Sequence, residues 1–275
     1  MIKFSHTIFA LPFALSAVVI AWESHFVSFS DIMWISFAMI GARTAAMGFN
    51  RVVDAQIDAK NPRTAKREIP LGLVSKKDSA ALIALSSLLF IFSAFMLSKA
   101  CFIFSIPVLC FLFFYSFTKK FTKYSHFFLG LAISLAPAGA WFAITDSLSF
   151  GIIFLCLSLM TYITGFDILY SCQDIEYDNK QNLFSLPSKI GAKKAMLISS
   201  LLHCLTFIFL IFVYISFNMH PVFLGFLFGI AVLLILEHKL VKPDNLQHIN
   251  IAFFYINSII SILLFIGVLT QSFLK

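Results

Sequence analysis

The stretch LSFGIIFLCLSLMTYITGFDILYS, residues 148–171, decides the fold class, because Asp167 is its single charged residue. A helix needs roughly 20 apolar residues to cross about 30 Å of hydrocarbon, so this stretch is long enough to span a bilayer. The same character extends over the whole chain, in which 60% of the 275 residues are hydrophobic and 12% are charged. Soluble domains contain roughly 25% charged residues. The sequence therefore predicts a polytopic membrane protein.

Apolar segments of similar length recur along the chain and leave no room for a soluble domain. The predicted membrane-spanning helices cover residues 6–26, 31–50, 79–98, 101–118, 125–145, 148–171, 195–217, 221–237 and 249–272. The first of them lacks a small-residue cleavage site, so we expect a retained helix rather than a removed signal peptide. The sequence thus predicts an all-α membrane helical bundle of about nine transmembrane helices that forms one domain over residues 1–275.

The basic residues alternate between the connections, which predicts the orientation of the helices. If the N-terminus is cytoplasmic, every Lys and Arg except Arg43, Lys99 and Lys275 lies in a cytoplasmic segment. Such a bias favours an N-in, C-out topology in the inner (cytoplasmic) membrane. The net charge of +7 therefore reflects topology, and no nucleic-acid partner is expected. Topology by itself also accounts for basic loops such as the one that holds Arg63 and Arg67.

The cysteines predict neither a disulfide framework nor a zinc site. They are widely spaced, form no C-x-x-C pair and fall in or beside apolar segments, at Cys101, Cys110, Cys156, Cys172 and Cys204. We expect all of them to be buried free thiols.

The acidic residues, in contrast, gather in two segments that topology does not explain. At about 100° per residue, each segment places its polar side chains on one narrow stripe of a helix that runs from an apolar span into a cytoplasmic connection. The first stripe holds Arg43, Asn50, Asp54 and Asp58, and the second holds Asp167, Tyr170, Asp174 and Asp178. Like charges on neighbouring turns repel each other, and carboxylates are costly in a membrane. Both stripes therefore need a positive partner.

A divalent cation is one such partner. Mg²⁺ binds one or two carboxylates, keeps several waters and completes its shell with phosphate oxygens. Arg side chains match the remaining phosphate charge. The alternative is a network of ion pairs between the acids and Arg63, Lys66 and Arg67. Such a network does not explain why two separate segments share one periodicity, so the pattern favours Mg²⁺ together with a phosphate-containing substrate.

The two segments resemble the aspartate-rich motifs of the UbiA superfamily of intramembrane prenyltransferases. The resemblance lies in NRVVDAQID (50–58), followed by RTAKR (63–67), and in DILYSCQDIEYD (167–178). It implies nine transmembrane helices with both motifs on the cytoplasmic side. NPRTAKREIPLG (61–72) and YSFTKKFTKYSHFFLGLAISLAPAGAWFAIT (115–145) further resemble 4-hydroxybenzoate polyprenyltransferases and their relatives in the futalosine route to menaquinone. Arg51 departs from the pattern, since many 4-hydroxybenzoate enzymes have Asp there.

The resemblance implies a role for each polar residue of the two stripes. Asn50, Asp54 and Asp58 would hold one Mg²⁺, and Asp174 and Asp178 would hold a second. Asp167 and Tyr170 would lie at the second site, with Asp167 as the candidate base. The residues expected to bind the diphosphate are Arg63, Arg67, Lys119 and Tyr170. The residues expected to act in catalysis are Arg43, Asp54, Asp167 and Asp174. His126 is expected to be a loop or core histidine.

The implied reaction transfers a polyprenyl group from polyprenyl diphosphate to a ring carbon of a hydroxy-aromatic acid such as 4-hydroxybenzoate, in ubiquinone or menaquinone biosynthesis. The expected partners are these two substrates and the lipid bilayer, and the chain is expected to be a monomer with its active site facing the cytoplasm. Two alternatives stay open. One is a haem- or chlorophyll-type prenyltransferase of the same fold, which differs in its acceptor. The other is a transporter that uses intramembrane acids.

Overall fold

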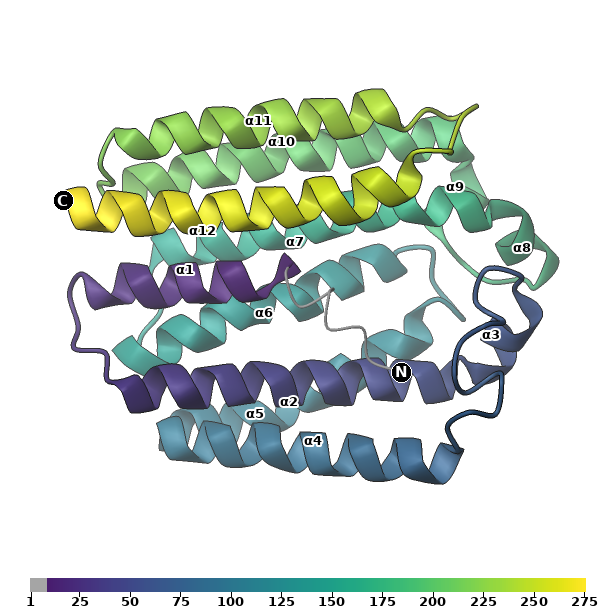
Figure 1. The fold of residues 1–275 in the computed structure, drawn as a ribbon, viewed down its shortest axis with the longest axis horizontal. Helices are drawn as coiled ribbons and strands as arrows, with labels where there is room; N and C mark the ends of the chain where they lie inside the picture. Colours follow the sequence, from purple (N-terminus) through teal and green to yellow (C-terminus); the bar gives the residue numbers. More distant parts are fainter. Residues whose placement is uncertain (1–8) are drawn as a thin grey trace. The chain divides into compact units, whose positions relative to one another are not determined.

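The computed structural model describes residues 9–275, and its regular elements are helices (Figure 1). The long helices are α1 (Leu11–Trp22), α2 (Phe29–Val53), α4 (Lys76–Leu97), α5 (Lys99–Thr118), α6 (Ser125–Thr145), α7 (Phe150–Ser171), α10 (Ala192–Ser216), α11 (Val222–Leu240) and α12 (Asn257–Leu274). Short helices lie between them: α3 (Ala55–Lys60), α8 (Ile175–Lys180) and α9 (Leu186–Ile190). A 3₁₀ turn covers Cys172–Asp174, and a π-helical segment, Ile251–Ile256, precedes α12.

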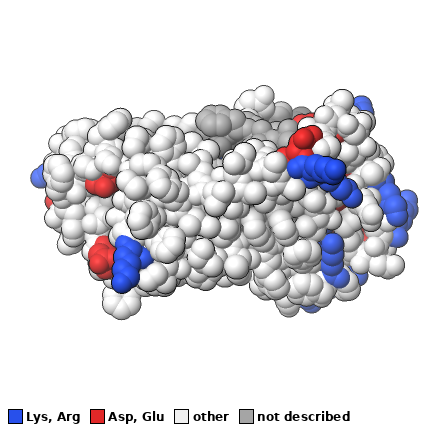
Figure 2. Space-filling view, turned by 90° about the horizontal axis from the view of Figure 1, so that it is seen from below, with Lys and Arg blue, Asp and Glu red and all other residues white. Residues whose placement is uncertain are grey.

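The predicted spans coincide with these long helices, although the first prediction starts at residue 6, outside the described residues. Within residues 9–275, eight helices are long and apolar enough to cross a membrane, and the 12-residue α1 is shorter. Most of the face in Figure 2 is neither acidic nor basic, as a surface in contact with lipid requires. The all-α membrane class is therefore confirmed, whereas the N-in, C-out orientation stays a prediction.

The prediction of buried thiols is wrong for part of the set. Among the five cysteines, only Cys172 is buried, and Cys110 and Cys204 are exposed. Both exposed thiols lie on long apolar helices, α5 and α10, on faces turned away from the other helices of their units. An apolar run does not reveal which of its faces meets protein and which meets lipid, so the sequence could not separate the two.

The chain forms two compact units, which are described one at a time. Unit 1 comprises Ser28–Thr118 within the described residues, and its main contact joins α2 to α4. Ser28 and Asp31 form a capping box at the start of α2, and Ser75 caps α4 by accepting a hydrogen bond from the backbone of Asp78. Each cap satisfies backbone donors that the first helical turn leaves without a partner.

Replacing Gly41, where α2 passes close to α4, with Ala is expected to destabilise the protein by about 1–3 kcal/mol. A Cβ at this position would lie 2.7 Å from the backbone nitrogen of Phe90 and 2.8 Å from the carbonyl oxygen of Ser86. The two helices would have to separate, and this cost exceeds the roughly 1 kcal/mol by which Ala is the better helix former. Thermal unfolding in detergent micelles measures the effect.

The matched control is Gly139→Ala on α6, where no described atom beyond the neighbouring residues and backbone of its own helix lies within 4 Å of the added Cβ. This variant is expected to be as stable as the unmodified protein or more so. Equal losses of melting temperature in the two variants would contradict the close approach at Gly41.

Unit 2 comprises residues 9–27 and Lys119–Lys275 and is built around α7. Helices α6 and α10 pack against α7, while α1 packs against α6 and α12. Within this unit, α8 and α9 follow the C-terminal end of α7 (Figure 1). Fully buried side chains such as Leu155, Leu159 and Tyr162 line α7. The helix that carries Asp167 is therefore well packed within the unit, which gives its polar end a fixed support.

Candidate active site

The first acidic segment continues the register of α2 across its end into α3. The backbone N–H of Asp54 donates to the carbonyl oxygen of Asn50 at 2.9 Å, and that of Asp58 donates to the carbonyl oxygen of Asp54 at 2.7 Å. The three side chains thus lie on successive turns, and Asn50 Nδ2 donates to Asp54 Oδ2 at 3.1 Å. Asp54 is 2% exposed and Asp58 is 4% exposed. Carboxylates this buried require compensating partners.

Arg67 supplies one such partner, because the loop after α3 folds back on itself. Arg63 N donates to the side chain of Asn61, and Thr64 Oγ1 donates to the carbonyl oxygen of Asp58 at 3.1 Å. This fold brings Arg67 Nη1 to 2.6 Å from Asp58 Oδ2. Arg51 Nη1 lies 3.9 Å from the same oxygen. The pair of Arg67 with Asp58 therefore forms part of the ion-pair network that the sequence allows as an alternative to Mg²⁺.

The other predicted residues of unit 1 lie in different surroundings. Arg43 is half-buried on α2, where its Nη2 lies 3.2 Å from Met47 Sδ. The side chains of Arg63 and Lys66 are exposed. Both side chains therefore reach solvent, while that of Arg67 is half-buried and paired with a carboxylate.

In the second acidic segment, Asp167 lies near the C-terminal end of α7 and contacts a histidine. His126 Nδ1, from the first turn of α6, is 2.6 Å from Asp167 Oδ2. The His126 side chain is 6% exposed, whereas that of Asp167 is 25% exposed. One turn further along α7, Tyr170 stacks on Phe253 with 4.0 Å between ring centroids. The end of α7 thus presents a carboxylate and an aromatic ring held in fixed positions.

The chain after α7 bends back to hold Asp178. Ser185 Oγ donates to Asp178 Oδ2 at 2.6 Å, and the same Ser185 caps α9 by accepting from Ser188 N. Lys119 is tied to this turn through its backbone, because its carbonyl oxygen accepts from Phe184 N at 2.8 Å. Lys119 and Asp178 therefore belong to one local structure. Asp174 is half-buried at the end of the 3₁₀ turn.

The polar side chains of the two acidic segments carry oxygen atoms of the kinds that bind Mg²⁺. Within residues 9–275, no group of three or more His, Cys, Asp or Glu side chains is placed to hold a metal. Mg²⁺ does not require such a group, because it is usually bound through one or two carboxylates, waters and substrate phosphate. The buried pair Asp54 and Asp58, with the amide of Asn50, offers hard oxygen ligands of this kind. The donor set is thus consistent with Mg²⁺ that arrives together with a phosphate group.

The sequence does not predict the contacts that two residues, His126 and Ser185, make with the acids of the second segment. His126 was expected to be a loop or core residue, and it is buried, but it also contacts Asp167 across 41 positions of the chain. Ser185 was not singled out, although a Ser that precedes a Leu-Pro pair is a recognisable helix start. No pattern in a single sequence connects a lone histidine to an acid so far along the chain.

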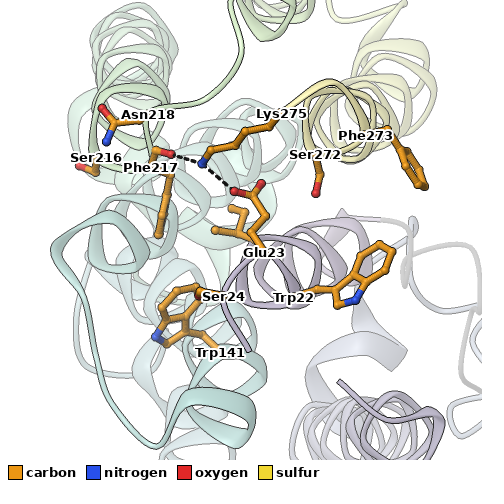
Figure 3. Close-up of a pocket in the computed structure, with 11 residues that line it drawn as sticks. Trp22, Glu23, Ser24, Trp141, Ser216, Phe217, Asn218, Ser272, Phe273 and Lys275 are labelled. Atoms are coloured by element: carbon orange, nitrogen blue, oxygen red, sulfur yellow. Dashed lines mark hydrogen bonds and ion pairs between the residues drawn. The ribbon is translucent and has the colours of Figure 1, made fainter. Parts of the chain in front are cut away.

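A separate cavity of about 630 Å³ lies in unit 2 where α1, α10 and α12 end (Figure 3). Its walls include Trp22, Glu23 and Lys275. Lys275 Nζ lies 2.7 Å from Glu23 Oε2 and 2.8 Å from the carbonyl oxygen of Phe217. None of the predicted site residues lines this cavity. Because its polar groups pair with each other, it does not replace the acidic segments as the candidate site.

Each of the two units thus combines helices that can cross a membrane with an acidic segment at the end of one of them, which defines the class as a multi-pass membrane protein. The family model described as the UbiA prenyltransferase family matches residues 10–259. The chain belongs to this family, and the predicted class of enzyme is confirmed at that level.

Relatives with assigned names agree with the family. The chain is 27% identical to the 4-hydroxybenzoate octaprenyltransferase of Vibrio atlanticus (strain LGP32), over 58% of this chain and 56% of that protein. It is 29% identical to the 4-hydroxybenzoate octaprenyltransferase of Blochmanniella pennsylvanica (strain BPEN), over 82% of this chain and 78% of that protein. The first match thus spans little more than half of that relative's length.

Solved structures share the fold over nearly the whole chain. The apo structure of a UbiA homolog from Aeropyrum pernix K1 superposes with a TM-score of 0.88 at 26% identity, covering 98% of this chain and 99% of that one. A UbiA homolog from Archaeoglobus fulgidus, bound to DMAPP and Mg²⁺, superposes with a TM-score of 0.75 at 15% identity, covering 98% and 96%. At 15% identity, the similarity to the Archaeoglobus homolog shows a shared fold only.

Proposed function

We propose that this chain transfers a polyprenyl group from polyprenyl diphosphate to a ring carbon of a hydroxy-aromatic acid, in a Mg²⁺-dependent step of respiratory quinone biosynthesis. The observation that carries the proposal is the helical register of Asn50, Asp54 and Asp58, which continues from α2 into α3, in a member of the UbiA prenyltransferase family. The names of the bacterial relatives support a 4-hydroxybenzoate-like acceptor. The ligands of the Archaeoglobus homolog support a prenyl diphosphate with Mg²⁺.

The proposed site must first bind the diphosphate of the prenyl donor. Asn50, Asp54 and Asp58 would hold one Mg²⁺, and Asp174 and Asp178 would hold the other. When bound, Mg²⁺ supplies the positive charge that makes diphosphate a competent leaving group. Arg67, which pairs with Asp58 at 2.6 Å, would offer its guanidinium fork to the diphosphate, and Arg63 and Lys119 would add positive charge.

The proposed site must also bind the aromatic acid that accepts the prenyl group. The bond between the prenyl carbon and the diphosphate oxygen breaks, and a carbon–carbon bond forms between the allylic cation and the aromatic ring. Asp167 accepts the proton that the ring loses, or holds the acceptor's hydroxyl in place. Arg43 lies near the acceptor or the diphosphate, and the Tyr170 ring shields the reacting groups from water. Aromatic faces also attract a cation.

The placement in the membrane follows the distribution of charge. We propose an N-in, C-out monomer in the inner membrane, with residues 1–275 forming one functional domain whose acidic segments face the cytoplasm. The water-soluble diphosphate would then leave to the cytoplasm while the polyprenyl tail stays in lipid.

A transfer assay tests the function. Membranes that contain the protein are incubated with Mg²⁺, a polyprenyl diphosphate and, in parallel, 4-hydroxybenzoate or a hydroxylated naphthoic acid. We expect a lipid-soluble prenylated aromatic product with at least one acceptor and none when EDTA replaces Mg²⁺. If neither acid is prenylated while haem or a chlorophyll precursor is, the proposed acceptor class is wrong. Absence of transfer to any acceptor would contradict the proposed function itself.

A further inference from the structure

The His126 ring joins two parts of unit 2 that carry different acids. One ring nitrogen, Nδ1, lies 2.6 Å from Asp167 Oδ2 at the end of α7. The other, Nε2, lies 3.3 Å from the backbone nitrogen of Leu186, the first residue of α9. Both contacts are made by one buried side chain of α6. Each ring nitrogen thus has a polar partner, as a buried imidazole requires.

These two contacts determine which nitrogen of the neutral ring carries the hydrogen. A backbone N–H can only donate, so Nε2 accepts from Leu186 and has no hydrogen of its own. Nδ1 therefore carries the hydrogen and donates it to the carboxylate of Asp167. One oxygen of Asp167 is occupied in this way, and the side chain, 25% exposed, keeps its other oxygen for a ligand.

The same ring also connects Asp167 to Asp178. Leu186 follows Ser185, whose Oγ donates to Asp178 Oδ2 at 2.6 Å. A chain of contacts thus runs from Asp167 through His126 and the start of α9 to Asp178. The two carboxylates are eleven positions apart in the sequence, and a 3₁₀ turn at Cys172–Asp174 interrupts the helix between them. Helix geometry alone therefore does not fix their separation.

We propose that His126 is a positioning residue, whose Nδ1–H holds the carboxylate of Asp167 in the orientation that prenyl transfer requires and whose Nε2 ties it to the start of α9, next to the Ser185 that holds Asp178. This inference rests on the proposed function, because the orientation matters only when an acceptor meets Asp167. Histidine is suited to the task, since its rigid ring presents a donor and an acceptor in opposite directions.

Three variants test the proposal in the transfer assay. His126→Leu removes both contacts at similar volume and is expected to lower kcat about 10- to 100-fold, with the KM for polyprenyl diphosphate changed less than about 3-fold. His126→Asn keeps a donor near the position of Nδ1 and is expected to recover activity to within roughly 5-fold of the unmodified protein. Thr164→Val removes the hydroxyl that contacts the carbonyl oxygens of Met160 at 2.7 Å and of His126 at 3.3 Å, without touching the His126 ring, and is expected to leave kcat unchanged.

A double variant separates positioning from packing. If His126 acts through Asp167, His126→Leu combined with Asp167→Asn is expected to be no slower than Asp167→Asn alone. Multiplying losses in the double variant would overturn the proposal, as would an unchanged kcat for His126→Leu. An equal loss of kcat in Thr164→Val would assign the effect to general packing of α6 on α7.

A spectroscopic measurement holds whether or not the protein proves to be a prenyltransferase. In protein labelled with ¹⁵N-histidine, the His126 signals are identified by their absence from His126→Asn. We expect a protonated Nδ1 and an unprotonated Nε2, and loss of this preference in Asp167→Ala. A ring protonated at Nε2 would overturn the positioning role. If the histidine spectrum is as expected but no acceptor is prenylated, the proposed function is contradicted, and with it the role of His126 in prenyl transfer.

Discussion

Asp54→Asn is expected to lower prenyl transfer at least about 100-fold, while the protein still folds. The substitution removes one negative charge from the buried pair Asp54 and Asp58 and weakens binding of the cation that neutralises the diphosphate. The change in shape is small, and an amide can still meet the side chain of Asn50, which now donates to Asp54 Oδ2 at 3.1 Å. Initial rates over a range of Mg²⁺ concentrations measure the effect. We expect a half-saturating Mg²⁺ concentration that is several-fold higher.

The matched control is Asp78→Asn, which makes the same change at an exposed acid in the first turn of α4 of the same unit. Its rate is expected to stay within about 2-fold of that of the unmodified protein. The comparison also distinguishes Mg²⁺ binding from the ion-pair alternative. If the acids served only to pair with Arg67, Asp54→Asn would change the melting temperature and leave the rate and its Mg²⁺ dependence intact.

The membrane helices could be predicted because the signal that defines them is local. The predicted span 125–145 coincides with α6 at both ends, and the predictions 101–118 and 148–171 end where α5 and α7 end. The burial cost of an unpaired backbone in lipid makes each long apolar run helical regardless of its neighbours. The polar spacing extends the expected helices as far as Asp58 in α3 and Asp178 in α8, whereas α9 is not predicted, because a segment of five residues carries no comparable signal.

The candidate site could be predicted only in part, because helical periodicity is a local signal and contacts between helices are not. The stripe of Asn50, Asp54 and Asp58 follows from helical periodicity, and the backbone hydrogen bonds confirm that register. The second stripe is interrupted, since the 3₁₀ turn that ends at Asp174 replaces the expected continuous helix. The contact between His126 and Asp167 joins two helices and depends on how α6 packs against α7. Periodicity contains no information about such a contact.

A second group of polar residues lies deep in unit 2, where no acidic motif had suggested one. Glu237 on α11 is fully buried, and its Oε1 accepts from Asn257 Nδ2 at 3.1 Å. His203 Nδ1 lies 3.5 Å from Glu237 Oε2 and 2.9 Å from His238 Nε2. Tyr162 completes the group by donating to the carbonyl oxygen of Asn257 at 2.8 Å. Ionisable groups in a membrane-spanning region are costly and need one another as partners.

Asn257 links this group to the backbone that precedes α12. Besides Glu237, its Nδ2 contacts the carbonyl oxygens of Ala252 and Phe253, both at 3.2 Å, in the π-helical segment before α12. A π-helix shifts the backbone hydrogen bonds by one residue, so a side-chain donor at its end stabilises it. One amide thus supports both a buried carboxyl group and an irregular stretch of backbone.

Asn257→Leu is therefore expected to destabilise the protein by about 3 kcal/mol, because it leaves Glu237 and these carbonyl oxygens buried without the donor that now serves them. Asn250→Leu is the matched control at an exposed position, with an expected change of about 0.5 kcal/mol or less. Glu237→Leu combined with Asn257→Leu is expected to cost less than Asn257→Leu alone, since removing both partners leaves no buried carboxyl group to satisfy. Unfolding in mixed detergent micelles, followed by far-ultraviolet circular dichroism, measures all three variants. Additive losses in the double variant would show that Asn257 stabilises the protein without acting on Glu237.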